Sequence, residues 1–335
     1  MRQRIDGRHN RVALFSLVAL AFLSALALAV APATAQTWPT KPIRFVIPFA
    51  PGGVADIAAR VVGQKLTEAW GQQVIVENRA GGNGFIGVST VAKAAPDGYT
   101  FLVATLGEIT INPSLFKELP YDVERDLAPV TSLTDTPCVF AVNAASPYKS
   151  MADLVADAKA RPGKISVATP GNGSVNQIIM EWTGLGTGTK FQHIPYKGGA
   201  PAAASHAGGD LPAGVLAVSS ATPHVRSGRV RMLAITTAQR SPLNPDLPTL
   251  QESGVADVDG TNWTALYAPK ATPQPIIDKL NAEVVKILAM PDVKERLATG
   301  GATTIPSTPA EVAARIKRET AAFKTINTRA NIQPE

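Results

Sequence analysis

The sequence has few of the residues on which disulfide-rich and metal-binding proteins depend. Cys138 is the only cysteine, and there are four histidines among 335 residues. A single cysteine excludes an intramolecular disulfide and a cysteine zinc cluster. His193, His206 and His224 have no pattern of ligands or partners near them, and no H-E-x-x-H motif is present. We therefore expect no metal site and no cofactor, and we expect the hydrophobic core to stabilise the fold.

Sequence motifs of enzymes are also scarce. No G-x-S-x-G motif is present, which argues against a hydrolase with a nucleophilic serine. One alternative arises because Gly82-x-Gly84-x-x-Gly87 follows a predicted strand and Glu108 comes 21 residues after Gly87. This spacing imitates the fingerprint of an NAD-dependent oxidoreductase. The unit is not the first strand–helix pair, however, and a long turn explains the same glycines, so we expect no enzymatic activity and keep a secreted oxidoreductase as the alternative.

Charged residues make up 17% of the chain, and the formal net charge is +6. Four arginines lie within the first 11 residues, so the remainder is only mildly basic. So small a positive net charge does not indicate a nucleic-acid-binding surface, and we expect no nucleic-acid partner. There is no tandem repeat, heptad run or low-complexity tract.

The first 35 residues have the pattern of an export signal. Four arginines precede an uncharged apolar run over residues 12–31, and Ala33-Thr34-Ala35 follows. A cleaved signal peptide typically has a basic start, then an apolar run, and then small residues at the cleavage site. The run is also about as long as a membrane span, so an uncleaved anchor is the rival interpretation. We expect cleavage after Ala35 and a soluble periplasmic protein, because no second long apolar run follows.

About 300 residues remain after this leader, a size at which chains divide into lobes. Short β-rich runs alternate with helical patterns, which predicts an α/β fold with a mostly parallel sheet. Strands are predicted at residues 43–47, 74–77, 99–104 and 165–168, and helices at 54–70 and after the caps at Ser150, Thr272 and Thr308. The β-rich segments 131–142 and 263–269 are predicted to connect the lobes. Lobe 1 then comprises residues 36–137 and 263–335, and lobe 2 comprises residues 138–262.

Two glycine-rich turns are candidates for a binding site. Pro48-Phe49-Ala50-Pro51-Gly52-Gly53 and Thr169-Pro170-Gly171-Asn172-Gly173-Ser174 each lie between a predicted strand and a predicted helix. Free backbone N–H groups at a helix N-terminus favour an anion such as a carboxylate. Two such turns facing each other across a cleft could clamp one ligand. The alternative is a pair of ordinary tight turns, and Asp56, in the first helical turn, is also expected for capping alone.

The order of several motifs resembles the Bug family, the extracytoplasmic receptors of tripartite tricarboxylate transporters. The matches run from about Trp38 to Lys324 and so cover nearly all of the chain after the leader. They are Pro48 to Asp56, Val76-Glu77-Asn78-Arg79-Ala80-Gly81, Ala95-Pro96-Asp97-Gly98-Tyr99-Thr100, Ile111-Asn112-Pro113, Leu119-Pro120-Tyr121-Asp122, His193 to Gly199 and Pro245-Asp246-Leu247-Pro248-Thr249.

The resemblance implies a type II periplasmic binding fold, in which two α/β lobes close on a ligand by a hinge motion. It further implies a small carboxylate ligand and delivery to the membrane subunits of a tripartite tricarboxylate-type transporter, or a role as a sensor. We expect a monomer. Carried over position by position, the resemblance assigns ligand contacts to Phe49, Ala50, Gly53, Asp56, Thr169, Gly171, Asn172 and Ser174. Lys197 is a weaker candidate, because an exposed loop lysine is expected there.

Five further residues complete the predicted site, namely Gly52, Thr105, Glu108, Gly173 and Ser219. The family often has small polar residues near Val54 and Ala55, and a different pattern around residues 216–220, so the far end of the pocket is unassigned. Glu108 occupies a position where related receptors tend to carry small or neutral groups. Two like charges 4 Å apart repel by about 4 kcal/mol at an effective dielectric constant of 20. We therefore predict a ligand with a single carboxylate and a hydrogen-bonding group facing Glu108, unless Glu108 turns to solvent or pairs with a lysine.

Overall fold

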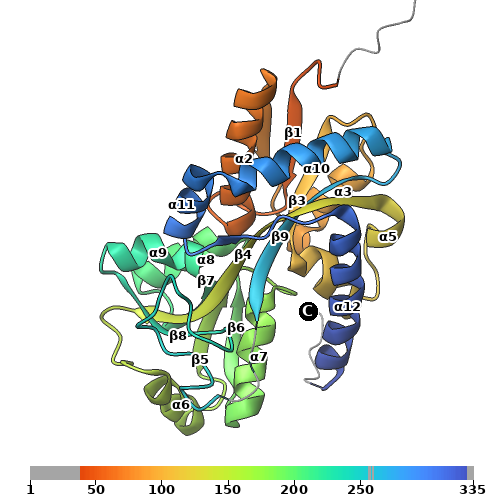
Figure 1. Ribbon diagram of the computed structural model, residues 1–335. Coiled ribbons are helices and arrows are strands. Elements are labelled where there is room, and N and C mark those ends of the chain that lie inside the picture. The colour runs from red at the N-terminus through yellow and green to blue at the C-terminus, as the bar shows by residue number, and fades with distance from the viewer. Residues whose placement is uncertain (1–37, 256–257, 259, 330–335) are drawn as a thin grey trace, which may run out of the picture. The chain divides into compact units, whose positions relative to one another are not determined.

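Strands and helices alternate along most of the chain (Figure 1). The computed structural model describes residues 38–255, 258 and 260–329, and the predicted leader at residues 1–35 lies outside these residues. Residues 1–40 and 41–335 are separate units, of which the second is described below. Its strands are β1 (Ile43–Ile47), β2 (Val74–Asn78), β3 (Thr100–Thr105), β4 (Leu127–Asn143), β5 (Ile165–Thr169), β6 (Phe191–Pro195), β7 (Ala213–Ala217), β8 (Val230–Ile235), β9 (Thr261–Pro269) and β10 (Thr303–Thr304).

The helical segments follow the strands in the order expected of an α/β fold, and the predicted fold class is confirmed. They are α2 (Val54–Trp70), η1 (Gly82–Gly84), α3 (Phe85–Ala92), η2 (Gly107–Ile111), α4 (Asn112–Leu115), α5 (Val123–Asp126), α6 (Met151–Ala160), α7 (Val175–Thr187), α8 (Gly199–Gly208), α9 (Val218–Arg226), α10 (Gln274–Ala289), α11 (Pro291–Thr299) and α12 (Pro309–Arg329). No helix among these described residues is long and apolar enough to cross a bilayer.

The sheet is mixed rather than mostly parallel, which corrects the prediction. Its strand order is β2-β1-β3-β9-β4-β7-β5-β6, and β8 and β10 also pair with β4. The outer pairs, β1 with β2 and β3 and β5 with β6 and β7, are parallel. The pairs that β4 and β9 make at the centre are antiparallel. The reason is that β4 and β9 carry the chain back and forth between the two groups of strands.

The central strand β4 belongs to both groups of strands. It pairs with β9 as far as Pro137 and with β7 from Cys138 onward. Figure 1 shows β4 as one long ribbon that runs from the β1–β3 side to the β5–β7 side. Its side chains after Pro137 alternate between two hydrophobic clusters, with Phe140 in one and Val139 in the other. A single strand therefore connects the two groups and contributes to the core on both of its faces.

The helix boundaries follow from caps that the sequence predicts. Helix α2 begins after Gly53 and ends at Gly71, which has the left-handed conformation (φ 65°) typical of a helix C-terminus. At the start of α6 the Ser150 and Asp153 side chains form the predicted capping box. At the start of α12 the Glu311 N–H donates to Thr308 Oγ1 at 3.2 Å. These three helix starts are confirmed.

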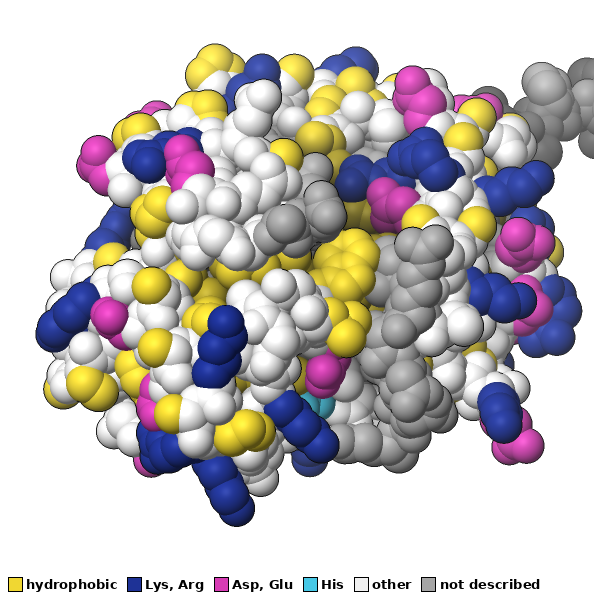
Figure 2. All heavy atoms as spheres, turned by 90° about the horizontal axis from the view of Figure 1, so that it is seen from below, with side chains coloured by type: hydrophobic (Ala, Val, Ile, Leu, Met, Phe, Trp, Pro, Cys, Tyr) yellow, Lys and Arg dark blue, Asp and Glu magenta, His cyan; other side chains and the backbone are white. Residues whose placement is uncertain are grey.

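Helix α12 packs across the strands β4 and β9. Trp263 Nε1 donates to Glu319 at 2.7 Å, and the Arg315 guanidinium lies 4.6 Å from the Trp263 ring centroid. Beside these residues an apolar groove lies between α7 and α12, with Trp182 and Phe323 among its lining residues. Figure 2 shows hydrophobic side chains near the middle of the lower face, with charged side chains of both signs scattered around them.

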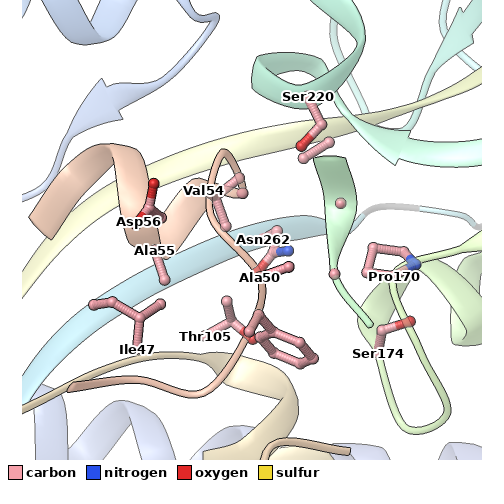
Figure 3. A pocket seen from close by; sticks show the side chains of 15 residues that line it. Ile47, Ala50, Val54, Ala55, Asp56, Thr105, Pro170, Ser174, Ser220 and Asn262 are labelled. Carbon is pink, nitrogen blue, oxygen red and sulfur yellow. The ribbon is translucent and has the colours of Figure 1, made fainter. Parts of the chain in front are cut away.

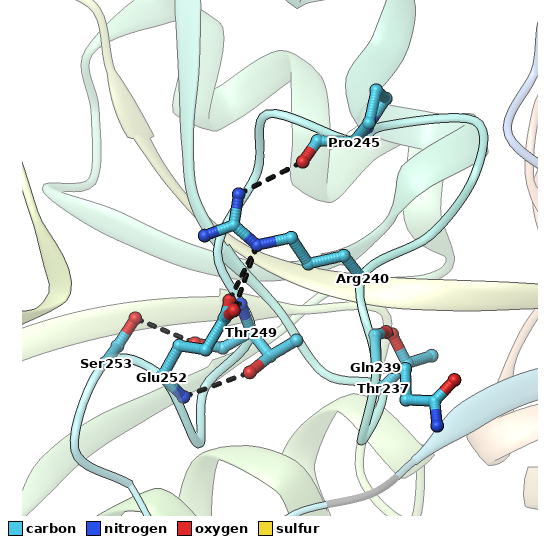
Figure 4. A network of polar contacts seen from close by, with 7 residues as sticks. All are labelled: Thr237, Gln239, Arg240, Pro245, Thr249, Glu252 and Ser253. Carbon is cyan, nitrogen blue, oxygen red and sulfur yellow. Dashed lines mark hydrogen bonds and ion pairs between the residues drawn. The ribbon is translucent and has the colours of Figure 1, made fainter.

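The long connection between β8 and β9 is held by a polar network (Figure 4). Arg240 donates to Glu252 at 2.8 Å and to the Pro245 carbonyl at 3.1 Å. Glu252 in turn accepts the Thr249 N–H at 2.8 Å. The Ile235 N–H donates to the Pro248 carbonyl, which fastens the loop to β8. The motif Pro245 to Thr249 thus has a structural role in this loop.

Candidate functional site

A pocket lies where the ends of several strands meet the starts of the following helices (Figure 3). It encloses about 440 Å³ of space between its lining residues, and this volume includes solvent at its open mouth. Six predicted site residues line it, namely Phe49, Ala50, Gly53, Asp56, Thr105 and Ser174. Nine lining residues were not predicted, namely Ile47, Val54, Ala55, Pro170, Gly198, Gly199, Ala217, Ser220 and Asn262.

Four helices begin at this pocket. The lining residues include Gly53, Ser174, Gly198 and Ala217, which are the N-cap residues of α2, α7, α8 and α9 respectively. The first N–H groups of a helix have no acceptor within the helix, and the helix dipole is positive at this end. Asp56 is the one charged residue among the described lining residues, and no lysine, arginine or histidine lines the pocket. The positive ends of four helix dipoles therefore lie at the edge of this pocket.

The two glycines of the first turn have different roles. Gly52 has φ 85°, and a Cβ atom there would lie 3.0 Å from the Ala200 Cβ atom. Gly53 has φ −83°, which any residue adopts, and a Cβ atom there would lie 3.8 Å from the Gly199 nitrogen. Backbone conformation thus requires glycine at position 52. At position 53 a side chain would fit the backbone but would enter the space between the starts of α2 and α8.

Asp56 holds the first turn in place. Its carboxylate accepts the Gly52 N–H at 2.8 Å, Asn78 Nδ2 at 3.0 Å and Arg60 Nε at 3.0 Å. Asn78 Nδ2 also donates to the Phe49 carbonyl at 3.0 Å. Burial raises the pKa of Asp56, but the hydrogen bonds from Arg60, Gly52 and Asn78 outweigh it and hold that pKa below its usual value. These partners fill the acceptor positions of a carboxylate, so Asp56 shapes the turn and is neutralised by Arg60.

Two N–H groups of the second predicted turn already form local hydrogen bonds. The Gly171 N–H donates to Thr169 Oγ1 at 3.3 Å, and the Gly173 N–H donates to Gln177 at 2.8 Å. Ser174 donates its hydroxyl to the Gly171 carbonyl at 2.6 Å. Of this turn, Pro170 and Ser174 line the pocket, whereas Thr169, Gly171, Asn172 and Gly173 do not. The turn therefore contributes a wall of the pocket and presents none of these N–H groups to an anion.

The segment from Tyr196 to Ala200 meets the first turn instead. The Ala50 N–H donates to the Lys197 carbonyl at 3.1 Å. Gly198 has φ 129°, and a Cβ atom there would lie 3.4 Å from the Ala50 nitrogen. The exposed side chain of Lys197 does not line the pocket. The Tyr-Lys-Gly-Gly motif thus contacts the first turn through its backbone and its glycines, and not through the lysine side chain.

Two buried polar side chains that line the pocket have atoms without a hydrogen-bond partner among the residues that the structure describes. These atoms are Ser220 Oγ, in the first turn of α9, and Asn262 Oδ1, at the start of β9. The two residues are 5% and 6% exposed. The hydroxyl of the neighbouring Ser219 is also unpartnered, but Ser219 does not line the pocket. A buried polar atom without a partner is costly, so Ser220 and Asn262 are suited to contact a bound molecule.

Glu108 lies behind the pocket wall and does not line it. Its carboxyl group accepts the Thr105 N–H at 2.8 Å and lies 3.1 Å from Thr105 Oγ1. The residue is 2% exposed, so its side chain does not turn to solvent, and no lysine within the described part of the chain forms an ion pair with it. Burial raises the pKa of Glu108 to about 8. The predicted repulsion of a tricarboxylate by an exposed charge at Glu108 therefore lacks its geometric basis.

The glycines that imitate a dinucleotide fingerprint serve close packing. A Cβ atom at Gly84 would lie 2.6 Å from Glu108 Cγ, and one at Gly87 would lie 2.6 Å from the Pro48 Cα atom. Gly84 also has φ 87°. These glycines bring η1 and α3 against the first turn and against Glu108, which is a structural reason for their spacing.

Comparison with known proteins agrees with this geometry. The sequence model of the tripartite tricarboxylate transporter family receptor matches residues 58–331. The chain belongs to this receptor family. Protein BugT of Bordetella pertussis, a curated relative, is 39% identical over 280 residues, which cover 83% of this chain and 86% of BugT. The predicted resemblance to the Bug family is confirmed.

Two solved structures of similar proteins contain carboxylates. Rpa4515 of R. palustris, solved with adipate, is 32% identical, with a TM-score of 0.86 and coverage of 89% of this chain and 100% of that one. MatC of Rhodopseudomonas palustris, with bound malate, is 30% identical, with a TM-score of 0.82 and coverage of 86% and 99%. The α/β fold of periplasmic binding proteins is therefore shown for this member of the receptor family, as is its role as a solute-binding receptor.

Proposed function

We propose that this receptor captures a small carboxylate in the pocket described above and delivers it to the membrane subunits of a tripartite tricarboxylate-type transporter, or acts as a sensor. The observation that carries the proposal is the convergence of four helix N-termini on a pocket without a lysine, arginine or histidine among its described lining residues. Adipate and malate in two similar proteins support a carboxylate as the ligand.

Backbone groups alone suffice for useful affinity. A hydrogen bond to a charged group contributes about 1.5–3 kcal/mol, and a helix N-terminus adds about 0.3–1 kcal/mol to the binding of an anion. Three or four such bonds, after the cost of ordering the ligand, reach the roughly 8 kcal/mol that corresponds to micromolar affinity. Ser220 and Asn262 remain for a second polar group of the ligand. We infer that they recognise its end away from α2.

The two groups of strands are proposed to be lobes that close on the ligand. Lobe 1 comprises residues 36–137 and 263–335, and lobe 2 residues 138–262. The change of partner within β4 at Pro137 and Cys138 supports this division. The Ala50 N–H donates to the Lys197 carbonyl and so joins the two proposed lobes, and bending at β4 and at the start of β9 would break this bond as the lobes separate.

The receptor is proposed to act without catalysis and without a cofactor. No cysteine or histidine is among the described residues that line the pocket, and the Asp56 carboxylate already accepts hydrogen bonds from Gly52, Arg60 and Asn78, which supports a pocket without a catalytic base. We also propose export with cleavage after Ala35, a monomeric state and no nucleic-acid partner. The mixed signs of charge on the face in Figure 2 support the last of these.

Thermal unfolding in the presence of a carboxylate panel tests the proposed function. The panel includes adipate, malate, citrate and benzoate, and adipamide serves as the uncharged counterpart of adipate. A ligand at 100 times its dissociation constant adds about 2.7 kcal/mol of stability, which raises Tm by roughly 4–5 °C for a chain of this size. We expect at least one acid to raise Tm and adipamide to have no effect. If no acid in an extended panel raises Tm, the receptor does not bind small carboxylates.

A pair of charge-matched variants tests the location of the site. Asn262→Asp adds a negative charge within the pocket, whereas Gln251→Glu adds one at an exposed position of the loop between β8 and β9. A like charge about 4 Å from a carboxylate costs about 4 kcal/mol at an effective dielectric constant of 20. We expect calorimetry to show at least a hundredfold loss of affinity for Asn262→Asp and an unchanged affinity for Gln251→Glu. Equal affinities in the two variants would place the ligand elsewhere.

A further inference from the structure

The hydrogen bonds of the Glu108 carboxyl group connect it to a pocket-lining residue, Thr105. Thr105 is the last residue of β3 and lines the pocket, whereas Glu108 lies in the π-helix η2 that follows. Both carboxyl oxygens of Glu108 lie 3.1 Å from Thr105 Oγ1, and one of them also accepts the Thr105 N–H at 2.8 Å. The hydrogen that lies between these side chains therefore decides what the threonine hydroxyl offers to a ligand.

The surroundings of Glu108 are neutral. Tyr121, from the segment after α4, donates its hydroxyl to the Glu108 carbonyl at 2.8 Å, and Tyr267 of β9 also interacts with the carboxyl group. Burial raises the pKa of both tyrosines, so they stay uncharged. From η1 the backbone of Gly84 packs against Glu108 Cγ. The charged residues of α12 nearest to this region, Arg315 and Glu319, bond to each other.

Among the described residues no cation forms an ion pair with Glu108, whose side chain is 2% exposed. A buried acid without a cation is more stable in its neutral form. In agreement with this, burial raises the pKa of Glu108 to about 8. The acid therefore changes its protonation state in a range where a carboxylate ligand stays ionised throughout.

The two protonation states have opposite effects on Thr105. A neutral Glu108 donates its O–H to Thr105 Oγ1, and the threonine hydrogen is then free to point into the pocket. An ionised Glu108 can only accept, so it takes the threonine hydrogen and leaves a lone pair facing the pocket. A carboxylate ligand is itself an acceptor only, and it is also repelled by the ionised acid.

We propose that Glu108 is a positioning residue whose neutral form turns the Thr105 hydroxyl into a donor for the carboxylate ligand, so that binding is coupled to the uptake of one proton from solvent. The inference rests on the proposed function, because it concerns a carboxylate in the same pocket. The proton resides on a carboxyl oxygen of Glu108, and the ligand stays ionised. Capture would therefore be tighter on the acidic side of neutrality than on the basic side.

Calorimetry between pH 6 and pH 9 tests the coupling. The probes are adipate, malate and the panel acid that raises Tm most. If only the neutral form of Glu108 binds and its pKa is about 8, the dissociation constant rises about tenfold between pH 6 and pH 9. Binding enthalpies in buffers of different ionisation enthalpy should show an uptake of about half a proton at pH 8. A merely structural role for Glu108 would give no proton uptake.

Three variants assign the effect to this pair. Glu108→Gln cannot ionise but can donate to Thr105 Oγ1 and accept the Thr105 N–H, so its affinity should be independent of pH and equal to that of the wild type at pH 6. Thr105→Ser retains the hydroxyl and should retain the pH dependence. Thr105→Val lacks the hydroxyl and should bind more weakly at pH 6 than the wild type does.

The outcomes separate this inference from the proposed function. Binding of a carboxylate with the same affinity at pH 6 and pH 9 would overturn the role of Glu108 and leave the proposed function intact. Retention of the tenfold change in Glu108→Gln would also overturn it, because another group would then take up the proton. Failure of every acid to bind at pH 6 would instead contradict the proposed function itself.

Discussion

Replacing Asp56 by alanine should destabilise the protein and impair binding, because the carboxylate anchors the first turn. The substitution removes the acceptor of the Gly52 N–H and of Asn78 Nδ2, which lie 2.8 and 3.0 Å away. Each such bond contributes about 1.5–3 kcal/mol. The ion pair with Arg60, whose side chain is 48% exposed, contributes at most about 1 kcal/mol. We expect the free energy of unfolding to fall by about 3–7 kcal/mol.

Urea unfolding at pH 7 measures this loss. Asp56→Asn keeps an acceptor for the Gly52 N–H and should cost about 1–2 kcal/mol. The matched control is Asp292→Ala, which removes an exposed ion pair with Lys65 and should cost less than about 1 kcal/mol. Calorimetry should show at least a tenfold loss of carboxylate affinity for Asp56→Ala, because the first turn loses its anchor.

The pH dependence of the effect follows from the lowered pKa of Asp56. A carboxylate whose pKa is lower in the folded protein contributes stability above its unfolded value of 3.8, and this contribution is lost as the pH falls through the folded value. The difference between the wild type and Asp56→Ala should therefore shrink below pH 4. A loss at pH 7 no larger than that of Asp292→Ala would refute the assignment of Asp56 as the anchor of the turn.

Three further predictions concern glycines and the buried acid. Gly53→Val should abolish carboxylate binding in calorimetry but change Tm by less than a few degrees. The backbone tolerates valine there, because φ is −83° and the nearest atom to a Cβ would be 3.8 Å away. An unchanged affinity would show that the anion binds elsewhere. Gly84→Ala should cost about 2–3 kcal/mol in urea unfolding, since a Cβ atom would lie 2.6 Å from Glu108 Cγ. Gly71 also has a left-handed backbone conformation, but no atom lies close to its Cβ position, so Gly71→Ala should cost about 1 kcal/mol. In the wild type, the free energy of unfolding should fall as the pH rises from about 5 to about 8, because the folded protein retains the Glu108 proton that the unfolded chain has lost. Glu108→Gln should remove most of this fall, which is on the order of 3–4 kcal/mol, and an equal fall in both proteins would contradict it.

Local signals predict the first strand, turn and helix well. The observed β1 and α2 have the predicted bounds, because an apolar run, a glycine turn and a helical repeat act over short distances. The mixed order of the sheet was missed for the opposite reason. The segment 131–142 reads as β-rich, but the antiparallel pairing of β4 with β7 and β9 depends on residues far away along the chain.

The same distinction applies to the site. The first turn was predicted as a candidate site because a glycine turn before a helix favours anions, and the family resemblance assigned Phe49, Ala50 and Gly53 within it as ligand contacts. Ser220 and Asn262 carry no such local signal, since only the tertiary fold brings the starts of α9 and β9 to the first turn. The burial of Glu108 could not be predicted from the local sequence either. Its sequence position suggests an exposed acid, whereas the approach of Gly84 and the bond to Thr105 bury it.

Because β4 pairs with both groups of strands and packs in two hydrophobic clusters, the fold also restricts how the gene can vary in length. Successive side chains of a strand point to opposite faces, so loss of one residue inverts every later position. In β4 this would exchange Cys138, Phe140 and Val142, which pack in one hydrophobic cluster, with Val139 and Ala141, which pack in the other. A deletion of one codon upstream of Cys138 would thus disrupt both clusters at once. We expect inherited insertions and deletions to be tolerated in exposed loops and to be eliminated from β4.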